Sequence, residues 1–203
     1  MKKILKFVLK NSIIFATVSF AFSMIGAFFP ESEFTIVIGN PLVVSNVTYE
    51  HVLGHVFWGA IIGLGTLSIR YIILGGSFAI FLDSDHLLQF LDIELVSRMS
   101  HSLPFGVIAV IVFFVITRGK DIRICAVAFG AVLSHIAFDI FLADVAFNSD
   151  TKFPLFSPFT FETVSFQGLD WLVIQIIGVS IVAAVSYFHK RKEIRFKNNL
   201  TKT

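Results

Sequence analysis

Long apolar runs separated by short polar segments extend along the whole chain. A helix of roughly 20 apolar residues is long enough to cross the hydrocarbon core of a bilayer. Six candidate spans can be read from the pattern: 11–29, 51–69, 71–82, 104–117, 124–147 and 169–188. The fourth is short unless it extends back through His101, and 87–98 resembles an amphipathic connector. The pattern predicts an all-α polytopic membrane protein with about six transmembrane helices.

The first apolar run has two possible fates. Four lysines precede it and Ala21-Phe22-Ser23 is a weak cleavage pattern, as in a secretory signal. The uncharged run 11–29 is long for the apolar region of a signal peptide, which favours a retained anchor. In either case the segment that follows is predicted to lie outside the cytoplasm.

Composition supports a membrane protein. Apolar residues make up 56% of the chain and charged residues 15%, whereas soluble domains are about one quarter charged. The net charge of +2 provides no basic surface of the kind that binds nucleic acid. Cys125, the only cysteine, excludes a disulfide within the chain. We expect a single membrane domain over residues 1–203.

The distribution of Lys and Arg predicts the orientation, because cytoplasmic loops carry an excess of these residues. With six spans and both termini in the cytoplasm, fourteen of the sixteen cations lie on the cytoplasmic side. Only Arg98 and Lys152 fall outside, and residues 189–203 form a basic cytoplasmic tail. The predicted location is therefore the cell membrane, with the chain crossing it several times.

Ionisable residues within the spans indicate function, because charges in a bilayer are costly. They occur at four places: His51 with His55, Asp83-Ser84-Asp85-His86, His101, and His135 with Asp139. A helical rise of about 1.5 Å per residue places all four at roughly 18–28 Å from the cytoplasmic helix ends. The predicted result is one polar layer in the outer half of the membrane.

The spacing within these groups predicts shared faces. His51 and His55, like His135 and Asp139, are four residues apart and lie on one helix face. Asp83 and His86 are three apart and also point one way. Imidazole and carboxylate together suit zinc, and also manganese or iron. A metal site or a proton-handling site is predicted where the three helices meet.

The same segments carry motifs of a known family. Leu82-Asp83-Ser84-Asp85-His86 resembles the Pro-Asp-x-Asp-His motif of the YdjM-like family of membrane-bound metal-dependent hydrolases. Ser100-His101-Ser102-Leu103 resembles its Thr-His-Ser-Leu, and Ser134-His135-x-x-x-Asp139 resembles its Ser-His-x-x-x-Asp. His55-x-x-x-Gly59 resembles its His-x-x-x-Gly, and Pro154–Pro158 resembles its Pro-containing loop. The resemblance covers about 51–160. Leu82 and Ser100 depart from the family pattern, Arg98 is one position from its Arg, and His51 has no clear counterpart.

The resemblance implies a hydrolase, and the predicted orientation places its site at the outer membrane face. A mechanism consistent with both is hydrolysis of an ester or phosphoester. The depth of the site favours a lipid or lipid-linked substrate. The expected metal ligands are His55, Asp83, His86, His135 and Asp139. One or two divalent ions, zinc or alternatively manganese, would activate a water. Asp85 or His101 would act as general base or as an orienting residue. Ser102 is expected to cap a helix ahead of Pro104.

Other functions remain open at the level of sequence. An intramembrane zinc protease needs His-Glu-x-x-His, but Val52 stands where the glutamate should be. A transporter could relay protons or ions through Asp and His side chains, although the inner half of the spans offers none. An accessory protein could use a closed metal site to hold its helices together.

Overall fold

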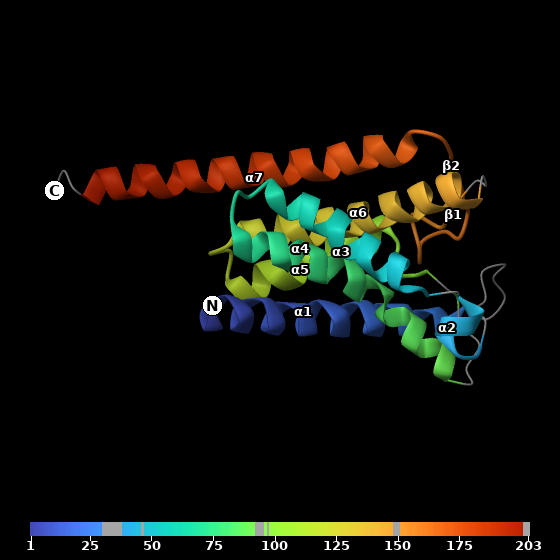
Figure 1. The fold of residues 1–203 in the computed structure, drawn as a ribbon. Helices are drawn as coiled ribbons and strands as arrows, with labels where there is room; N and C mark the ends of the chain where they lie inside the picture. The colour runs from blue at the N-terminus through green and yellow to red at the C-terminus, as the bar shows by residue number, and fades with distance from the viewer. Residues whose placement is uncertain (30–37, 46, 92–95, 97, 148–150, 201–203) are drawn as a thin grey trace.

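The computed structural model describes residues 1–29, 38–45, 47–91, 96, 98–147 and 151–200. The chain is mostly helical, which confirms the all-α prediction in outline. Six longer helices make up the fold (Figure 1): α1 (Lys2–Ser23), α3 (Tyr49–Leu64), α4 (Ile69–Leu82), α5 (Leu103–Thr117), α6 (Ile122–Phe147) and α7 (Asp170–Leu200). Each corresponds to one of the six predicted apolar runs.

Four of the helical segments are long and apolar enough to cross a membrane, by length and composition: Lys2–Phe28, Ile69–Phe90, Ile122–Val145 and Asp170–Arg195. The helices α3 and α5, with 16 and 15 residues, are shorter. The membrane-protein prediction is therefore supported for four helices, and the count of six remains a prediction.

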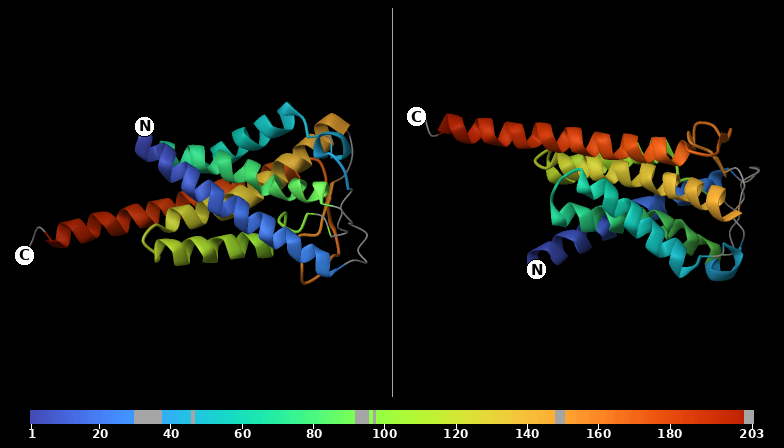
Figure 2. Two further views of the ribbon diagram at one scale, coloured as in Figure 1. Left: turned by 90° about the horizontal axis from the view of Figure 1, so that it is seen from below. Right: turned by 45° about the horizontal axis from the view of Figure 1, so that its top comes forward.

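Successive long helices run in alternating directions, so the bundle has two distinct ends. Both termini and the turn between α3 and α4 lie at one end, whereas the β1–β2 hairpin lies at the other (Figures 1 and 2). An even number of crossings returns a chain to its starting side, so this arrangement agrees with the predicted six.

Glycines allow α3 and α4 to pack backbone against backbone. A Cβ added at Gly59 would lie 2.3 Å from the carbonyl oxygen of Gly75, and one added at Gly75 would lie 2.3 Å from that of Gly59. Only glycine permits so close an approach. The contact matters for the site because His55 is one helical turn before Gly59 and Asp83 is two turns after Gly75.

The helix α1 is an integral part of the bundle. Phe15 is fully buried, and its ring stacks on that of Phe78 of α4 with centroids 4.4 Å apart. Phe105 of α5 packs edge-on against Phe15 at 5.6 Å. The core therefore joins the first helix to α4 and α5, the two elements that lead into and out of the polar segment 83–102.

Several boundaries differ from those predicted. The helix α7 continues to Leu200, so the basic tail is helical, and His189 pairs with Glu193 at 3.3 Å one turn later. The segment between the predicted spans 124–147 and 169–188, which includes the Pro-containing loop, contains the antiparallel strands β1 (Thr151–Phe153) and β2 (Val164–Phe166). The connector 87–98 begins within the 3-10 helix η2 (Asp83–Phe90), and residues 92–95 and 97 lie outside the described part.

Two further short elements lie at the hairpin end. A 3-10 turn, η1 (Met24–Phe28), continues α1, and a single helical turn, α2 (Pro41–Val44), precedes α3. Gly39 donates its backbone N–H to the carbonyl oxygen of Gln89 at 2.8 Å, which ties this segment to η2. These elements surround the polar cluster described next.

Candidate metal centre

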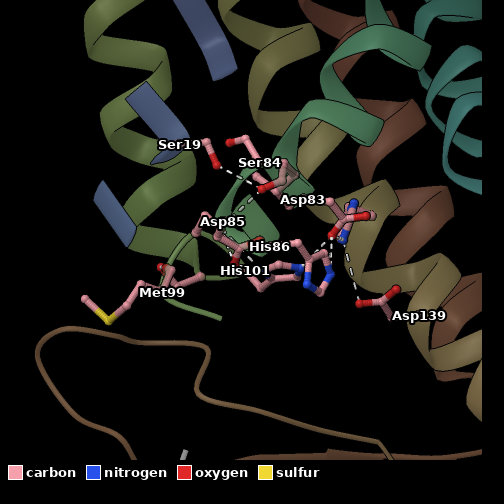
Figure 3. Close-up of polar contacts among 12 residues, drawn as sticks. Ser19, Asp83, Ser84, Asp85, His86, Met99, His101 and Asp139 are labelled. Carbon is pink, nitrogen blue, oxygen red and sulfur yellow. Dashed lines mark hydrogen bonds and ion pairs between the residues drawn. The ribbon is translucent and has the colours of Figure 1, made fainter. Parts of the chain in front are cut away.

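Eight ionisable side chains from four parts of the chain meet at the hairpin end of the bundle (Figure 3). They are His51 and His55 of α3, Asp83, Asp85 and His86 of η2, His101 of the turn before α5, and His135 and Asp139 of α6. All the candidate site residues named from the sequence are among them. The predicted convergence is therefore observed, and the cluster has the composition and spacing of a group that can bind metal.

Asp83 occupies the middle of the cluster. Its Oδ2 lies 3.3 Å from Nε2 of His51 and 3.6 Å from Nε2 of His55. Its Oδ1 faces three other imidazoles, with Nε2 of His135, His101 and His86 at 3.2, 3.5 and 3.6 Å. Each carboxylate oxygen thus has its own set of nitrogen neighbours.

Asp139 supplies a second carboxylate, which contacts the same Nε2 atoms of His55 and His135 as Asp83 does. Its Oδ1 is 3.2 Å from Nε2 of His55, and its Oδ2 is 3.7 Å from Nε2 of His135. The rings of these two histidines are stacked, with centroids 3.7 Å apart and planes inclined by 8°. The Nε2 atom of each of these two fully buried imidazoles therefore faces two carboxylates.

The end of α4 explains the position of Asp83. The helix ends at Leu82, and the Asp83 N–H donates to Ile80 O as the chain tightens into the 3-10 helix η2. The Ser19 hydroxyl of α1 donates to Leu82 O at 3.0 Å, and the Ser84 hydroxyl to Ala16 O at 3.2 Å. These bonds hold the first residues of η2 against α1, and they were not foreseeable from motif spacing.

The change of helix type corrects one assumption made from the sequence. Asp83 and His86 were expected to share one α-helical face, but α4 ends at Leu82, where the predicted third span also ends, so both residues follow the α-helix. A 3-10 helix has about three residues per turn, so residues i and i+3 still project on the same side. The two side chains consequently face the site as expected, although for a different geometric reason.

A backbone hydrogen bond fixes the orientation of His135. Its Nδ1 lies 2.7 Å from Ala79 O, an arrangement in which Nδ1–H donates. Nε2 is buried, faces Asp83, and lacks a well-formed hydrogen bond within the described residues. With Nδ1 protonated, neutral His135 directs a lone pair at a carboxylate, an unfavourable contact unless a cation or a proton lies between them.

Asp85 is placed behind His101 instead of at the centre. Its Oδ2 lies 3.6 Å from Nδ1 of His101 and accepts a hydrogen bond from the Ser100 hydroxyl at 3.3 Å. His101 turns its other nitrogen, Nε2, towards Asp83. A carboxylate behind an imidazole commonly orients a metal-binding histidine. Of the roles considered for Asp85, the orienting one agrees best with this position.

His101 belongs to the turn that precedes α5, so the fourth helix does not extend back through it. The Ser102 side chain caps α5 by accepting the Phe105 N–H at 3.3 Å, with Pro104 in the first turn. This confirms the cap predicted for Ser102. The Leu103 N–H donates to Leu155 O at 2.9 Å, which ties the turn to the hairpin segment.

Removing the cap is expected to destabilise this turn. Ser102→Ala deletes the bond from Phe105 N–H and the 2.8 Å bond that the hydroxyl donates to Met99 O. We expect a loss of about 1 kcal/mol in stability, the usual value for a cap. The measurement is the apparent melting temperature in detergent, with Ser102→Thr as the control that keeps the hydroxyl. Equal melting temperatures for all three proteins would contradict this role.

His51 was left without a role by the sequence, yet it belongs to the cluster. Its Nε2 lies 3.1 Å from Nε2 of His55 and 3.3 Å from Asp83. The four-residue spacing from His55 was the available signal. His86 is more peripheral: 28% of its side chain is exposed, and Nδ1 contacts Oε1 of Gln89 at 3.2 Å.

The donor atoms fit a divalent ion. Two ligands about 2.1 Å from a tetrahedral ion are about 3.4 Å apart, and the nitrogen–oxygen separations around Asp83 are 3.2–3.6 Å. Four sets of three ligand atoms lie within 4.8 Å of one another: His51, His55 and Asp83; His55, His135 and Asp139; Asp83, His101 and His135; and Asp83, Asp85 and His86. The donors are imidazoles and carboxylates, as in zinc sites.

Comparisons of the chain with protein families, with curated proteins and with solved structures found no match. The resemblance to the YdjM-like hydrolases consequently remains a prediction from the motifs.

Proposed function

We propose that this protein is a membrane-bound metal-dependent hydrolase of the YdjM-like type, with six spans and both termini in the cytoplasm. In this proposal the cluster lies near the extracytoplasmic face and binds one or two divalent ions. The substrate is an ester or phosphoester, with a lipid or lipid-linked molecule favoured. The support comes from the polar cluster together with the apolar helices around it.

One observation carries the proposal: both carboxylate oxygens of Asp83 are surrounded by imidazole nitrogens. Three of these histidines, His55, His101 and His135, are buried. Buried charge and unpaired nitrogen lone pairs are costly unless they are compensated. A divalent ion compensates both at once, which favours a metal centre over a purely structural polar core.

The donor set favours zinc. Imidazole nitrogen is a good zinc ligand, whereas magnesium and calcium prefer oxygen ligands. Manganese is the alternative, because it accepts imidazole together with carboxylate. The ligands proposed here are His55, Asp83, His86, His135 and Asp139, to which the geometry adds His51 and His101.

A bound ion supplies Lewis acidity that activates water for attack on an ester or phosphoester. The residues of the chain provide the remaining functions. Asp85 orients His101, and the hydrogen bond to Ala79 O holds Nε2 of His135 towards the centre. Asp83 and Asp139 both contact the Nε2 atoms of His55 and His135. A carboxylate oxygen of either residue that did not bind the metal could accept a proton.

The depth of the cluster supports a substrate from the lipid phase. His51 lies in the first turn of α3, and the exposed side chains near it include Tyr49 and Leu53. Phe156 and Phe159, in the hairpin segment at the same end, are also exposed. Apolar surface beside a polar centre suits a molecule with a polar headgroup and an acyl or prenyl chain.

The decisive experiment measures metal in the purified full-length protein by elemental mass spectrometry. We expect one or two zinc or manganese ions per chain, and loss of them in an Asp83→Ala/His135→Ala double variant with unchanged helical content. Metal-loaded protein is then assayed on lipid phosphoesters, with the double variant as control. Absence of metal after reconstitution would overturn the hydrolase proposal and would favour the proton- or ion-relay function. Bound metal without turnover across the ester panel would favour the accessory, structural site.

A further inference from the structure

A second candidate site lies at the opposite end of the bundle, where α1 begins. A cavity of about 460 Å³ opens between the first turns of α1, the end of α5 and the start of α6. Its lining includes Lys3, Lys6 and Lys10, together with the apolar side chains of Phe7, Ile116 and Ile124. The metal centre involves none of these residues.

The three lysines share one face of α1. They are separated by three and four residues, a spacing that places side chains in line along a helix. Across the part of the chain that the structure describes, none of the three ammonium groups forms an ion pair. Their charges therefore remain available to an anion entering the cavity.

The one carboxylate that lines the cavity is already paired. Asp121 accepts a hydrogen bond from the Tyr71 hydroxyl and one from Nε of Arg123 at 3.1 Å. Nη2 of Arg70 lies 3.7 Å from its Oδ2. Two arginines thus neutralise the one carboxylate of the lining, while the lining also carries three lysines. The local surplus of positive charge favours an anionic ligand.

The apolar part of the lining distinguishes a lipid from a soluble anion. Ile116 lies in the last turn of α5 and Ile124 in the first turn of α6, at the level where the apolar helices give way to charged residues. The neighbouring side chains Leu5, Leu9 and Ile13 of α1 are exposed, as expected for a surface in contact with lipid. A phosphate group at the lysines would have its glycerol and first acyl carbons beside these apolar groups.

We propose that this cavity binds the headgroup of an anionic glycerophospholipid in the leaflet that contains the N-terminus of α1. The lysines hold the phosphate, and Phe7, Ile116 and Ile124 contact the glycerol and the start of the acyl chains. This inference depends on the cavity and its charges and is independent of the metal centre. In the proposed orientation, the leaflet is the cytoplasmic one, which carries anionic lipids.

The test uses the full chain in nanodiscs of phosphatidylcholine with added phosphatidylglycerol, and native mass spectrometry of the lipid that remains bound. We expect selective retention of phosphatidylglycerol by the unmodified protein. Lys3→Gln/Lys6→Gln/Lys10→Gln should weaken the binding of phosphatidylglycerol about a hundredfold, because three basic residues that attract an anionic lipid are lost together. The matched control is Lys190→Gln/Arg191→Gln/Lys192→Gln, which removes equal charge from the basic tail. An equal loss in the control would show a general charge effect and overturn the site.

A second variant keeps all the charges, in case removal of the lysines alters insertion. Ile116→Trp fills the cavity, and we expect it to lose selective retention while the helical content stays unchanged. Full retention in this variant would place the lipid elsewhere and overturn the proposal. Competition by inorganic phosphate in detergent, as effective as that by phosphatidylglycerol, would assign the cavity to a soluble anion instead of a lipid.

Discussion

Asp83→Asn is expected to reduce the bound metal to less than about one tenth of the unmodified level, because one carboxylate faces all five imidazoles. The substitution keeps the size of the side chain but replaces the charged oxygens with a neutral amide. Asparagine cannot balance the charge of a divalent ion. Its NH₂ group would also donate hydrogen bonds to the nitrogen lone pairs that the metal needs. Elemental mass spectrometry of the purified variant measures the effect directly.

Asp85→Asn is the matched control, two residues along the same 3-10 helix. Asp85 contacts His101 at 3.6 Å and Ser100 at 3.3 Å, so its loss should weaken metal affinity by about 10–100-fold without changing the number of ions bound at saturation. Equal loss of metal at saturation from both variants would show that Asp85 is itself a ligand. Full retention by Asp83→Asn would contradict the central position of Asp83.

Gly59→Ala is expected to destabilise the protein by about 2–3 kcal/mol and to lower its affinity for metal at the same time. The new Cβ would lie 2.3 Å from Gly75 O and 2.5 Å from the Cβ of Ala79, so α3 and α4 must move apart. His55 lies one turn before Gly59, and Ala79 O holds His135. Separation of the two helices therefore pulls the ligands away from each other.

Gly178→Ala on α7 is the control, because it shows how a glycine-to-alanine change in a helix affects stability and metal affinity without a clash between two backbones. A Cβ there would meet the end of the Ile62 side chain at 2.8 Å, which can rotate, instead of a backbone carbonyl. Both substitutions gain about 1 kcal/mol in helix propensity. We expect a lower apparent melting temperature and weakened metal binding for Gly59→Ala alone. Similar melting temperatures for the two variants would contradict close packing between α3 and α4.

Much of the helical layout could be predicted because the apolar runs are long and the charged turns between them are short. The position of α6 follows from the charges at 118–123 and the polar residues after Phe147. The meeting of His51, His55, His135 and Asp139 could also be anticipated, since a four-residue spacing fixes the face and the helical rise fixes the depth. The face and the depth of a residue are local properties of its own helix, and they do not depend on how neighbouring helices pack.

The local structure and hydrogen bonds at several element ends could not be predicted, because they depend on contacts between distant segments. The predicted third span and α4 both end at residue 82, but the change to a 3-10 helix at Asp83 was not predicted. There, Ser19 donates to Leu82 O from 63 residues away. The bond from His135 to Ala79 O connects residues 56 apart. No spacing rule reveals either pair, and for the same reason the assignment of Asp85 behind His101 required the structure.

The point at which α4 ends has an electrostatic consequence for the ion. The peptide dipoles of an α-helix add up to roughly half a negative elementary charge at its C-terminus. Because α4 ends at Leu82, directly before Asp83, this partial charge is directed at the same place as the carboxylate. The surrounding apolar helices screen it far less than water would. The backbone of α4 therefore favours a cation at the centre, even before any side chain coordinates one.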